Sequence, residues 1–502
     1  MVIDYLILGL YALGMVIISL VTRKRSKGVN DFLLAGKKGL NGLMSAFSYG
    51  TTYFSAVIFI GYAGKFGAMY QLASIWIGVG NAFIGALLAW KILAKRTKNM
   101  TRRLEAKTMP SFFASRYDSP KMKTVSAIII FLFLIPYSAS VYNGLSSLFE
   151  ITFGIPGWVI MIALAVLTAL YLFFGGYFAT ALSDFIQGII MLLGVVLMIF
   201  FFLKSDQVNW DLSGLNWFTF NSAKKGIYGD TVSLISLIVL TSFGVYGLPQ
   251  TVHKYYAIRD SKAIKQGTIV STAFALIIGF GAYFVGGLSS KFFTPDQMAG
   301  IGYDNLIPNM LNIVIPVGLT GIIAVLILSA SMSTLSSVSL ASASVVAIDL
   351  YKDKINKKAS DKNVTWTMRA LCLVFVAISL TLAILNEKFK ITAIAYLMGL
   401  SWGTLSGCFI GPFVLGMISK KVTKSAAWVS IVGSLILTII LLLVFGFDYN
   451  GWNCSIGMAI KSGIGCSPLI GCICMAFSIL STLIVSKFTK KPSDQVIYNA
   501  FE

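Results

Sequence analysis

The stretch LSASMSTLSSVSLASAS, residues 328–344, carries nine hydroxyl side chains in seventeen positions, although the apolar run GLTGIIAVLI precedes it directly. Small hydroxylated residues let membrane helices approach closely and bond to backbone carbonyls. They also offer oxygen atoms to a cation without a full negative charge. The stretch therefore predicts a buried membrane helix that either packs tightly through its small residues or holds a cation.

The whole chain has the composition of a protein that crosses a membrane many times. Of its 502 residues, 57% are hydrophobic and only 12% are charged, whereas a soluble fold of this size would need more charged surface. Stretches such as 3–22 and 425–446 are long enough to cross a hydrocarbon layer of roughly 30 Å as helices. We expect the first to be a retained span, because it contains Asp4 and no basic residue precedes its core.

The hydropathy pattern predicts an all-α polytopic membrane protein with about thirteen transmembrane helices. These spans lie near 3–22, 40–64, 70–94, 123–149, 155–174, 180–203, 231–251, 265–289, 310–348, 365–386, 390–418, 425–446 and 466–486. Loops rich in Lys and Arg stay cytoplasmic, and the basic loops all fall on one side of this path. We therefore expect a protein of the cell (cytoplasmic) membrane with its N-terminus outside and its C-terminus in the cytoplasm.

The formal net charge of +21 arises from these basic loops and requires no nucleic-acid partner. The only histidine, His253, falls in a predicted cytoplasmic loop, so no zinc-type Cys/His cluster is expected. Residues 61–67 resemble a phosphate-binding loop, but Phe66 stands where Ser or Thr must hold magnesium. We expect neither ATP-driven pumping nor an enzyme, and no obligatory protein partner. Cys454 and Cys466, on the predicted external side, could bridge or stay free.

Helical spacing sorts the hydroxyl groups of the serine-rich helix. One face carries Ala330, Ser333, Thr334 and Ser337, and Ser336 lies one position round from Ser337. A hard cation such as Na⁺ needs about five oxygen ligands. Such a stripe therefore needs carbonyl oxygens from a broken helix opposite it.

The second predicted span, 40–64, is the candidate for that broken helix. Gly50 is followed by Thr51, Thr52 and Tyr53, which places a glycine and two β-branched residues in mid-membrane, a pattern that weakens an α-helix. Unwinding there would free carbonyls to face a cation or a solute. The predicted span 231–251 would be the equivalent broken helix of a second repeat.

Asp184, within the stretch 171–188, is the carboxylate placed most clearly inside a predicted span. Acidic residues inside a membrane are costly and indicate a role with an ion or a proton. Alternatively, Asp184 lies in the first turns of the sixth span, where the helix dipole and interfacial water tolerate it.

Four motifs along the chain resemble the sodium:solute symporter family. They are Gly175-Gly176 with Ser183-Asp184 and Gln187-Gly188, ASMSTLSS at 330–337 closed by Asp349-Leu350-Tyr351, GLPQ with KYYA within 247–257, and LGM with KK and KSAA within 415–427. The resemblance implies a sodium-coupled symporter that imports a small sugar, amino acid, carboxylate or vitamin-like solute through the lipid bilayer by alternating access. A proton-coupled symporter that uses Asp184 and a transporter-like membrane receptor or sensor are the alternatives.

The resemblance also implies a LeuT-type fold of two inverted five-helix repeats. The implied divisions are an extra N-terminal helix at 3–22, a first repeat at 40–203, a second repeat at 231–418, two C-terminal helices at 425–486 and a cytoplasmic tail at 487–502. The implied Na⁺ ligands are the carbonyls of Gly50, Tyr53 and Ala330 and the hydroxyls of Ser333 and Thr334. Some members have a second Na⁺ site, and Asp184, Ser336 and Ser337 match its positions.

The implied solute pocket departs from better-known members. Pro136 stands at the position of the arginine that binds the carboxylate of sialic acid, and no acidic residue lies between Ser45 and Lys65, where proline carriers have one. Span position suggests Phe54, Ser55, Ser74, Tyr142, Asn143, Phe243, Tyr246, Trp402 and Thr404 as pocket residues. Each of them could instead face lipid or pack between helices.

Overall fold

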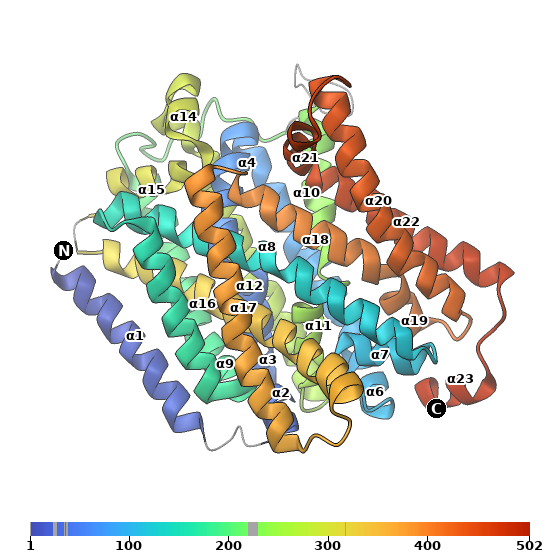
Figure 1. The fold of residues 1–502 in the computed structure, drawn as a ribbon. Coiled ribbons are helices and arrows are strands. Elements are labelled where there is room, and N and C mark those ends of the chain that lie inside the picture. Colours follow the sequence, from blue (N-terminus) through green and yellow to red (C-terminus); the bar gives the residue numbers. More distant parts are fainter. Residues whose placement is uncertain (1, 24–27, 35, 37–38, 219–228, 317) are drawn as a thin grey trace.

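The computed structural model describes the chain except for residues 1, 24–27, 35, 37–38, 219–228 and 317 (Figure 1). The described residues are mostly helical and contain no β-strand, only a single bridge between Leu40 and Ile258. Eleven helical segments of the described chain are long and apolar enough to cross a membrane, which makes this a multi-pass membrane protein. They are Val2–Thr22 (α1), Val57–Arg103, Pro120–Phe153 (α8), Gly157–Lys204 (α9), Asp230–Tyr256, Ser261–Phe292, Thr320–Ile355, Asp361–Phe389 (α17), Ile394–Ile418, Lys424–Asn450 (α20) and Ser467–Phe488 (α22).

Two of these segments are too long for a single crossing. Val57–Arg103 has 47 residues and α9 has 48, whereas about 20 residues cross a hydrocarbon core. The backbone breaks inside each segment, at Gln71 with φ 52° and at Gly176 with φ 64°. Glycine adopts positive φ without steric cost, so Gly176 separates two helices within α9. The total of thirteen spans stays a prediction.

The second predicted span is an interrupted helix, but its break comes later than expected. Helix α3 (Gly42–Tyr53) is continuous through residues 50–53, so the prediction of unwinding at these four positions was wrong. The chain leaves the helical conformation at Phe54, with φ −103° and ψ 100°. It resumes as the π-helix η2 (Val57–Tyr62) and continues as α4 (Ala63–Tyr70).

Side-chain bonds to other helices explain why the last turn of α3 stays helical. The Thr52 hydroxyl lies 2.8 Å from the Ser337 hydroxyl, and the Tyr53 hydroxyl donates to the Thr241 carbonyl at 2.7 Å. These tertiary contacts override the weak helix propensity of a glycine and two β-branched residues.

Helices α10 (Asp230–Gly244) and α11 (Pro249–Tyr256) form the second interrupted helix, as predicted for this span. Proline is favoured at the first position of α11, because the amide it lacks would have no helical partner there. Gly247 lies in the break, where an added Cβ would be 2.9 Å from the Ser406 Cα of α18 (Ile394–Ile410). The close approach of this break to α18 therefore requires glycine.

The serine-rich helix begins later than predicted. Helix α16 (Thr320–Ser344), extended by the π-helix η6 (Val345–Ile355), starts ten residues after the beginning of the predicted span 310–348. The residues before it belong to a separate helix, α15 (Tyr303–Val314). A residue that precedes proline is pushed into the extended conformation, and Ile315 before Pro316 is extended, with φ −84° and ψ 123°.

Helix α16 is the most deeply buried of these segments. In the apolar stretch of the segment Thr320–Ile355, 94% of the residues are buried, compared with 33% in the apolar stretch of α20. It packs against α1, α3, α8, α9 and α17. Its small serine and alanine side chains allow this many helices to approach one another closely, as the packing interpretation of the serines requires.

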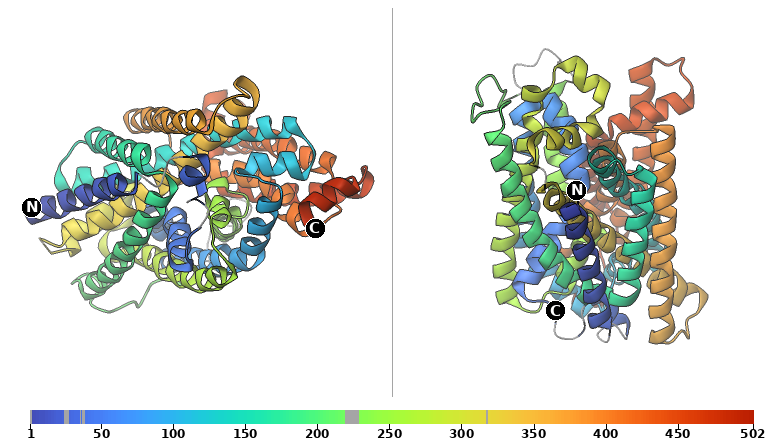
Figure 2. Two further views of the ribbon diagram at one scale, coloured as in Figure 1. Left: turned by 90° about the horizontal axis from the view of Figure 1, so that it is seen from below. Right: turned by 90° about the vertical axis from the view of Figure 1, so that its left-hand side faces the viewer.

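Different segments lie at the two ends of the helical bundle (Figures 1 and 2). The lower end in Figure 1 holds α2 (Val29–Leu34), α6 (Lys95–Arg103), α23 (Asp494–Phe501) and the C-terminus. The sequence of α6, KRTKNMTRR, is strongly basic. The upper end holds α4, α15, α14 (Pro295–Ile301) and α21 (Ile456–Gly465). Because basic segments stay cytoplasmic, we expect the lower end to face the cytoplasm.

A cysteine at Lys357 should react with a membrane-impermeant maleimide only from the cytoplasm, and one at Asp296 only from outside. Both positions are exposed, at opposite ends of the bundle, and the native thiols of Cys454 and Cys466 are free, so these two are first replaced by serine. Labelling of intact and permeabilised cells measures the sidedness. Reaction of both cysteines from one side would contradict the orientation. Asn221, an alternative external position, lies outside the described residues.

Candidate functional site

The break after α3 leaves a backbone carbonyl without its helical partner. The Phe54 amide donates to the Gly50 carbonyl at 2.9 Å, which is the last intrahelical bond of α3. The Thr51 carbonyl instead faces α16, where it accepts the Ser333 hydroxyl at 3.1 Å and the Thr334 hydroxyl at 3.3 Å. The broken helix and the serine-rich helix therefore meet at this carbonyl.

This junction collects the oxygen atoms that an alkali cation needs. The Ser333 hydroxyl also lies 3.2 Å from the Ala330 carbonyl, so two hydroxyls and two carbonyls converge. Such ligands suit a hard cation like Na⁺. Within the described chain, no three His, Cys, Asp or Glu side chains form a group that could hold a metal ion. The donor set at the junction therefore fits Na⁺ and consists of neutral oxygens.

The Thr51 carbonyl is a site group that sequence reasoning missed. The predicted carbonyls were those of Gly50 and Tyr53, and the Gly50 carbonyl is bonded within α3. Which carbonyl a break exposes depends on the residue at which the helix ends, and no side-chain pattern reveals that position to better than a few residues. The carbonyls of Gly50 and Tyr53 stay predicted ligands.

Asp184, on α9, lies in a second buried polar cluster. This cluster meets α16 at Ser337, about one helical turn after Ser333 and Thr334. The Oδ2 atom of Asp184 accepts the Ser48 hydroxyl at 2.6 Å and lies 3.4 Å from the Nζ atom of Lys254. Lys254 also donates to Ser48 at 2.9 Å and to Ser337 at 2.8 Å. The Asp184 side chain is 0% exposed. The alternative placement of Asp184 in interfacial water is therefore wrong.

The cluster contains only part of the predicted second Na⁺ site. Ser337 joins Asp184, whereas the Ser336 hydroxyl donates to the Ser333 carbonyl of its own helix at 2.9 Å. His253 was predicted to lie in a cytoplasmic loop, but it is buried within α11 together with Lys254, so this prediction was wrong. Proline at the start of α11 was the signal for a helix there, because proline favours the first helical position.

An aromatic cluster lies beside the break. The ring of Tyr53 stacks on the Trp402 indole with centroids 5.9 Å apart, and Tyr137 approaches the same indole edge-on at 5.7 Å. Phe54, whose ring lies 4.7 Å from that of Tyr53, and Ser55 are fully buried. The Tyr137 hydroxyl lies near Ser55, Thr334 and the Trp402 indole, but neither it nor the Trp402 Nε1 atom makes a well-directed hydrogen bond among the described residues. Buried donors of this kind usually have a partner, and a polar solute would supply it.

Phe54, Ser55 and Trp402 were predicted as pocket residues, and the structure brings them together. Tyr137 was missed, although it directly follows Pro136, the position at which this chain departs from sialic acid carriers. A single tyrosine in a long apolar helix gives no signal of its own. Its role emerges only from the contact with Trp402 in α18.

Most other predicted pocket residues make their hydrogen bonds or ring contacts outside this aromatic cluster. Ser74, Thr404 and Tyr246 donate their hydroxyls to backbone carbonyls of the protein. Phe243 is 36% exposed. Tyr142 is buried on α8, and its hydroxyl has no partner within the described part of the chain. These contacts are those of helix packing.

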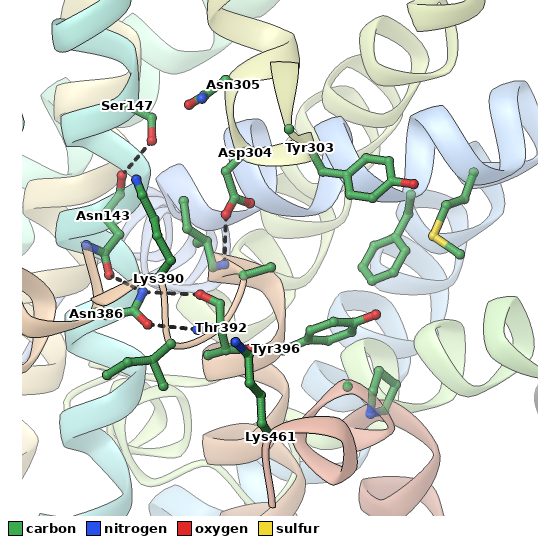
Figure 3. A pocket seen from close by; sticks show the side chains of 18 of the residues that line it. Asn143, Ser147, Tyr303, Asp304, Asn305, Asn386, Lys390, Thr392, Tyr396 and Lys461 are labelled. Atoms are coloured by element: carbon green, nitrogen blue, oxygen red, sulfur yellow. Dashed lines mark hydrogen bonds between the residues drawn. The ribbon is translucent and has the colours of Figure 1, made fainter. Parts of the chain in front are cut away.

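A pocket of about 1000 Å³ lies at the upper end of the bundle (Figure 3). Asn143 of α8 donates to the Ala383 carbonyl at 2.9 Å and accepts the side-chain amide of Asn386 at 3.1 Å. Asn386 in turn accepts the Thr392 amide at 3.1 Å. This chain of bonds connects α8, α17 and the segment before α18 at the wall of the pocket.

Charged side chains of both signs line the same pocket. The acidic members are Glu150, Asp304 and Glu387, and the basic members are Lys390 and Lys461. Asp304, on α15 outside the spans, accepts the backbone amide of Ile394 at 3.2 Å, and burial raises the pKa of its carboxyl. The lining therefore offers both signs of charge to a solute that carries both.

The pocket and the break share the second half of the first interrupted helix. Phe66 of α4 lines the pocket, and its ring packs edge-on against that of Tyr62 in η2, with centroids 5.2 Å apart. Tyr62 is four residues closer to the break. Tyr62 and Phe66 therefore connect the wall of the pocket to the segment that follows the break.

The model of the sodium:solute symporter family matches residues 32–433 of this chain. The osmoregulated proline transporter of Bacillus subtilis is 29% identical over 503 residues, which cover 97% of this chain and 95% of that protein. The sodium/pantothenate symporter of Escherichia coli is 28% identical over 447 residues, covering 86% of this chain and 88% of that protein.

A similar fold occurs in a solved structure of a Na⁺-coupled sialic acid symporter in a substrate-bound, outward-open state. The TM-score is 0.73 at 18% sequence identity, and the match covers 98% of this chain and 99% of the other. This likeness confirms an all-helical transporter fold of the LeuT type. It does not extend to the solute, because the identity is too low.

Replacing Ser333 or Thr334 by alanine should weaken Na⁺ binding without abolishing it, because each change removes one oxygen from a set that also contains carbonyls. Loss of one buried polar partner costs on the order of 1–3 kcal/mol. The Na⁺ concentration for half-maximal solute uptake should therefore rise roughly ten- to a hundred-fold. Uptake should partly recover at very high Na⁺.

Ser339→Ala and Ser342→Ala are the matched controls. Both hydroxyls are buried on α16 and have no hydrogen-bond partner among the described residues, so their loss should cost about 0.6 kcal/mol or less. If all four variants change the Na⁺ dependence alike, the serines only pack the helices.

Proposed function

Because the chain belongs to the sodium:solute symporter family, we propose that it imports a compact zwitterionic solute of the amino acid class across the cell membrane. Sodium-coupled symport of a small solute is the activity of this chain. The proposal adds the class of the solute and the groups that bind it and Na⁺. The N-terminus lies outside, the C-terminus in the cytoplasm, and the solute crosses without a covalent change.

The observation that carries the proposal is the bond from two α16 hydroxyls to the carbonyl exposed by the α3 break. Na⁺ at this point is held by Ser333, Thr334 and the carbonyls of Thr51 and Ala330, so it joins the broken helix to the serine-rich helix. Carbonyls of Gly50 and Tyr53 are the further candidates for its ligands. Na⁺ binding thereby favours the arrangement in which these two helices are in contact.

Solute and Na⁺ are coupled because they bind to the two sides of one break. Tyr53 and Phe54, at the end of α3, belong to the aromatic cluster, while Thr51, in the same turn, faces the serine-rich helix. Each ligand raises the affinity of the other by the same factor. Each Na⁺ that crosses about 100 mV adds roughly 2.3 kcal/mol to the driving force before its concentration term.

The chemistry of the aromatic cluster supports a zwitterion. Its side chains (Tyr53, Phe54, Ser55, Tyr137 and Trp402) carry no formal charge, so a solute with a net charge would be costly to bury there. A carboxylate can accept hydrogen bonds from the Tyr137 hydroxyl and the Trp402 Nε1, and an ammonium or imino group is attracted to the face of an aromatic ring. A zwitterion thus supplies both groups and no net charge.

The solutes carried by the relatives narrow the class of solute further. Proline, the solute of the Bacillus subtilis relative, is a compact zwitterion with an apolar ring that suits the aromatic rings of Tyr53 and Trp402. Pantothenate, the solute of the Escherichia coli relative, is a larger anion. We therefore rank compact amino acids above carboxylates without an amino group. The class is wider than proline, because this chain lacks the acidic residue that proline carriers have between Ser45 and Lys65.

Purified protein in liposomes should accumulate L-proline when an inward Na⁺ gradient is imposed, and should not do so when K⁺ replaces Na⁺. Pantothenate and sialic acid serve as the comparison solutes. Accumulation of pantothenate alone would overturn the zwitterion class. Accumulation driven by a proton gradient without Na⁺ would favour the proton-coupled alternative, and binding without accumulation would favour the receptor alternative.

Trp402→Phe and Tyr137→Phe should each raise the KM for the solute, because each removes one donor and keeps an aromatic ring. The expected change is about tenfold, from a loss of roughly 1–2 kcal/mol. The Na⁺ half-saturation at saturating solute should stay within about twofold of the wild-type value. Tyr142→Phe, which removes another buried hydroxyl of α8, is the matched control. Equal effects in all three variants would contradict the assignment of the pocket.

A further inference from the structure

Lys254 is a buried lysine held inside the polar cluster around Asp184. It comes from α11, the second half of the second interrupted helix, and its side chain is 2% exposed, while that of Asp184 on α9 is 0% exposed. A buried charge is costly unless it is paired and hydrogen-bonded. Each member of this pair therefore needs the other to remain charged inside the bundle.

The ammonium group has oxygen neighbours on three other helices. The Nζ atom lies 2.9 Å from Ser48 Oγ on α3, 2.8 Å from Ser337 Oγ on α16, and 3.4 Å from Asp184 Oδ2 on α9. The ring of Tyr177 covers a further side, with its centroid 5.2 Å from Nζ. Two hydroxyls, a carboxylate and an aromatic face surround the ammonium as they would surround a bound cation.

These oxygens are the ones that a second Na⁺ would use. The family resemblance predicts Asp184 and Ser337 as its ligands, but the hydroxyl lone pairs of Ser337 and Ser48 already accept hydrogen bonds from Lys254. The Oδ2 atom of Asp184 also accepts the Ser48 hydroxyl, whereas its Oδ1 atom has no hydrogen-bond partner among the described residues. A Na⁺ ion beside the ammonium would share one carboxylate with a like charge a few ångströms away, which is strongly unfavourable in a buried site.

We propose that the Lys254 ammonium is the permanent cation of this cluster, so that the protein couples one Na⁺, held where α3 meets α16, to each solute. The inference rests on the proposed function, because it assigns the stoichiometry of the same transport cycle. The lysine stays attached to α11 and is not released with the solute.

Lys254 also links two helices of the bundle. It joins α11 to α3, and backbone bonds also join a residue just before α3 to the residues after α11: the Leu40 amide donates to the Ala257 carbonyl at 2.8 Å, and the Arg259 amide to the Leu40 carbonyl at 3.0 Å. A second Na⁺ would connect these helices only while it was bound. Lys254 connects them whether or not Na⁺ is present.

The equilibrium accumulation of L-proline in liposomes measures the stoichiometry directly. With a tenfold Na⁺ gradient and the membrane potential clamped at zero, a zwitterion accumulates about tenfold if one Na⁺ moves with it and about a hundredfold if two do. Wild-type protein should give the tenfold value. Lys254→Met leaves Asp184, Ser48 and Ser337 free for a second Na⁺, so the ratio should rise toward a hundredfold.

Two further variants test whether the positive charge of Lys254 and the carboxylate of Asp184 set the accumulation ratio. Lys254→Arg keeps the positive charge and should stay at tenfold. Lys254→Met combined with Asp184→Asn removes both charges, and with them the carboxylate that a second Na⁺ needs, so it should return to tenfold. If the Lys254→Met protein does not fold, Lys254→Gln, which can still bond to the two serines, takes its place.

A hundredfold accumulation by the wild-type protein would overturn the inference and leave sodium-coupled symport intact. A tenfold value in both Lys254→Met and Lys254→Gln would also overturn it. If L-proline does not accumulate, the ratio is measured with whichever zwitterion does. The absence of any Na⁺-driven accumulation would instead overturn the proposed function.

Discussion

An exposed backbone carbonyl in the middle of a membrane bundle is the constraint on which the rest of this structure depends. Helix α3 ends at Tyr53, and an unsatisfied backbone group inside a bilayer costs on the order of several kcal/mol. The hydroxyls of Ser333 and Thr334 satisfy the Thr51 carbonyl. A helix that delivers hydroxyls to this depth must be polar and still buried, which explains the many small serines of α16. Because a cation can replace those hydrogen bonds, the break and the proposed cation site are one feature.

The buried charges fix the surroundings of that junction. Asp349, at the π-helical end of α16, accepts the hydroxyls of Thr108 and Ser111 at 2.6 Å each and lies 3.4 Å from the Nζ atom of Lys123. These contacts join α16 to α8 and to α7 (Met109–Arg116). The Lys254 cluster joins α16 to α11 in its middle. A helix held at several points can act as the static partner against which interrupted helices move.

Local patterns in the sequence predict the parts of this site that depend on one helix. The face of Ser333 and Thr334 follows from helical spacing, and the interruption near Gly50 follows from propensity to within a few residues. The partners of Asp184 do not follow in this way, because Ser48 and Lys254 lie 136 and 70 residues away along the chain and meet it only through the packing of four helices. The contact of Tyr137 with Trp402, and the start of α16 at Thr320 rather than at 310, likewise depend on tertiary structure and on Pro316.

Hydrogen–deuterium exchange of the purified protein in Na⁺ and in K⁺ tests most directly whether Na⁺ joins the broken helix to the serine-rich helix. The structure predicts that Na⁺ slows exchange in peptides from residues 42–62 and 328–340, with the same half-saturating concentration for both, because one ion would stabilise both segments. Peptides from α20, which does not contact the junction, should not change. Protection of only one segment, or no protection in a protein that still transports its solute with Na⁺, would contradict the account.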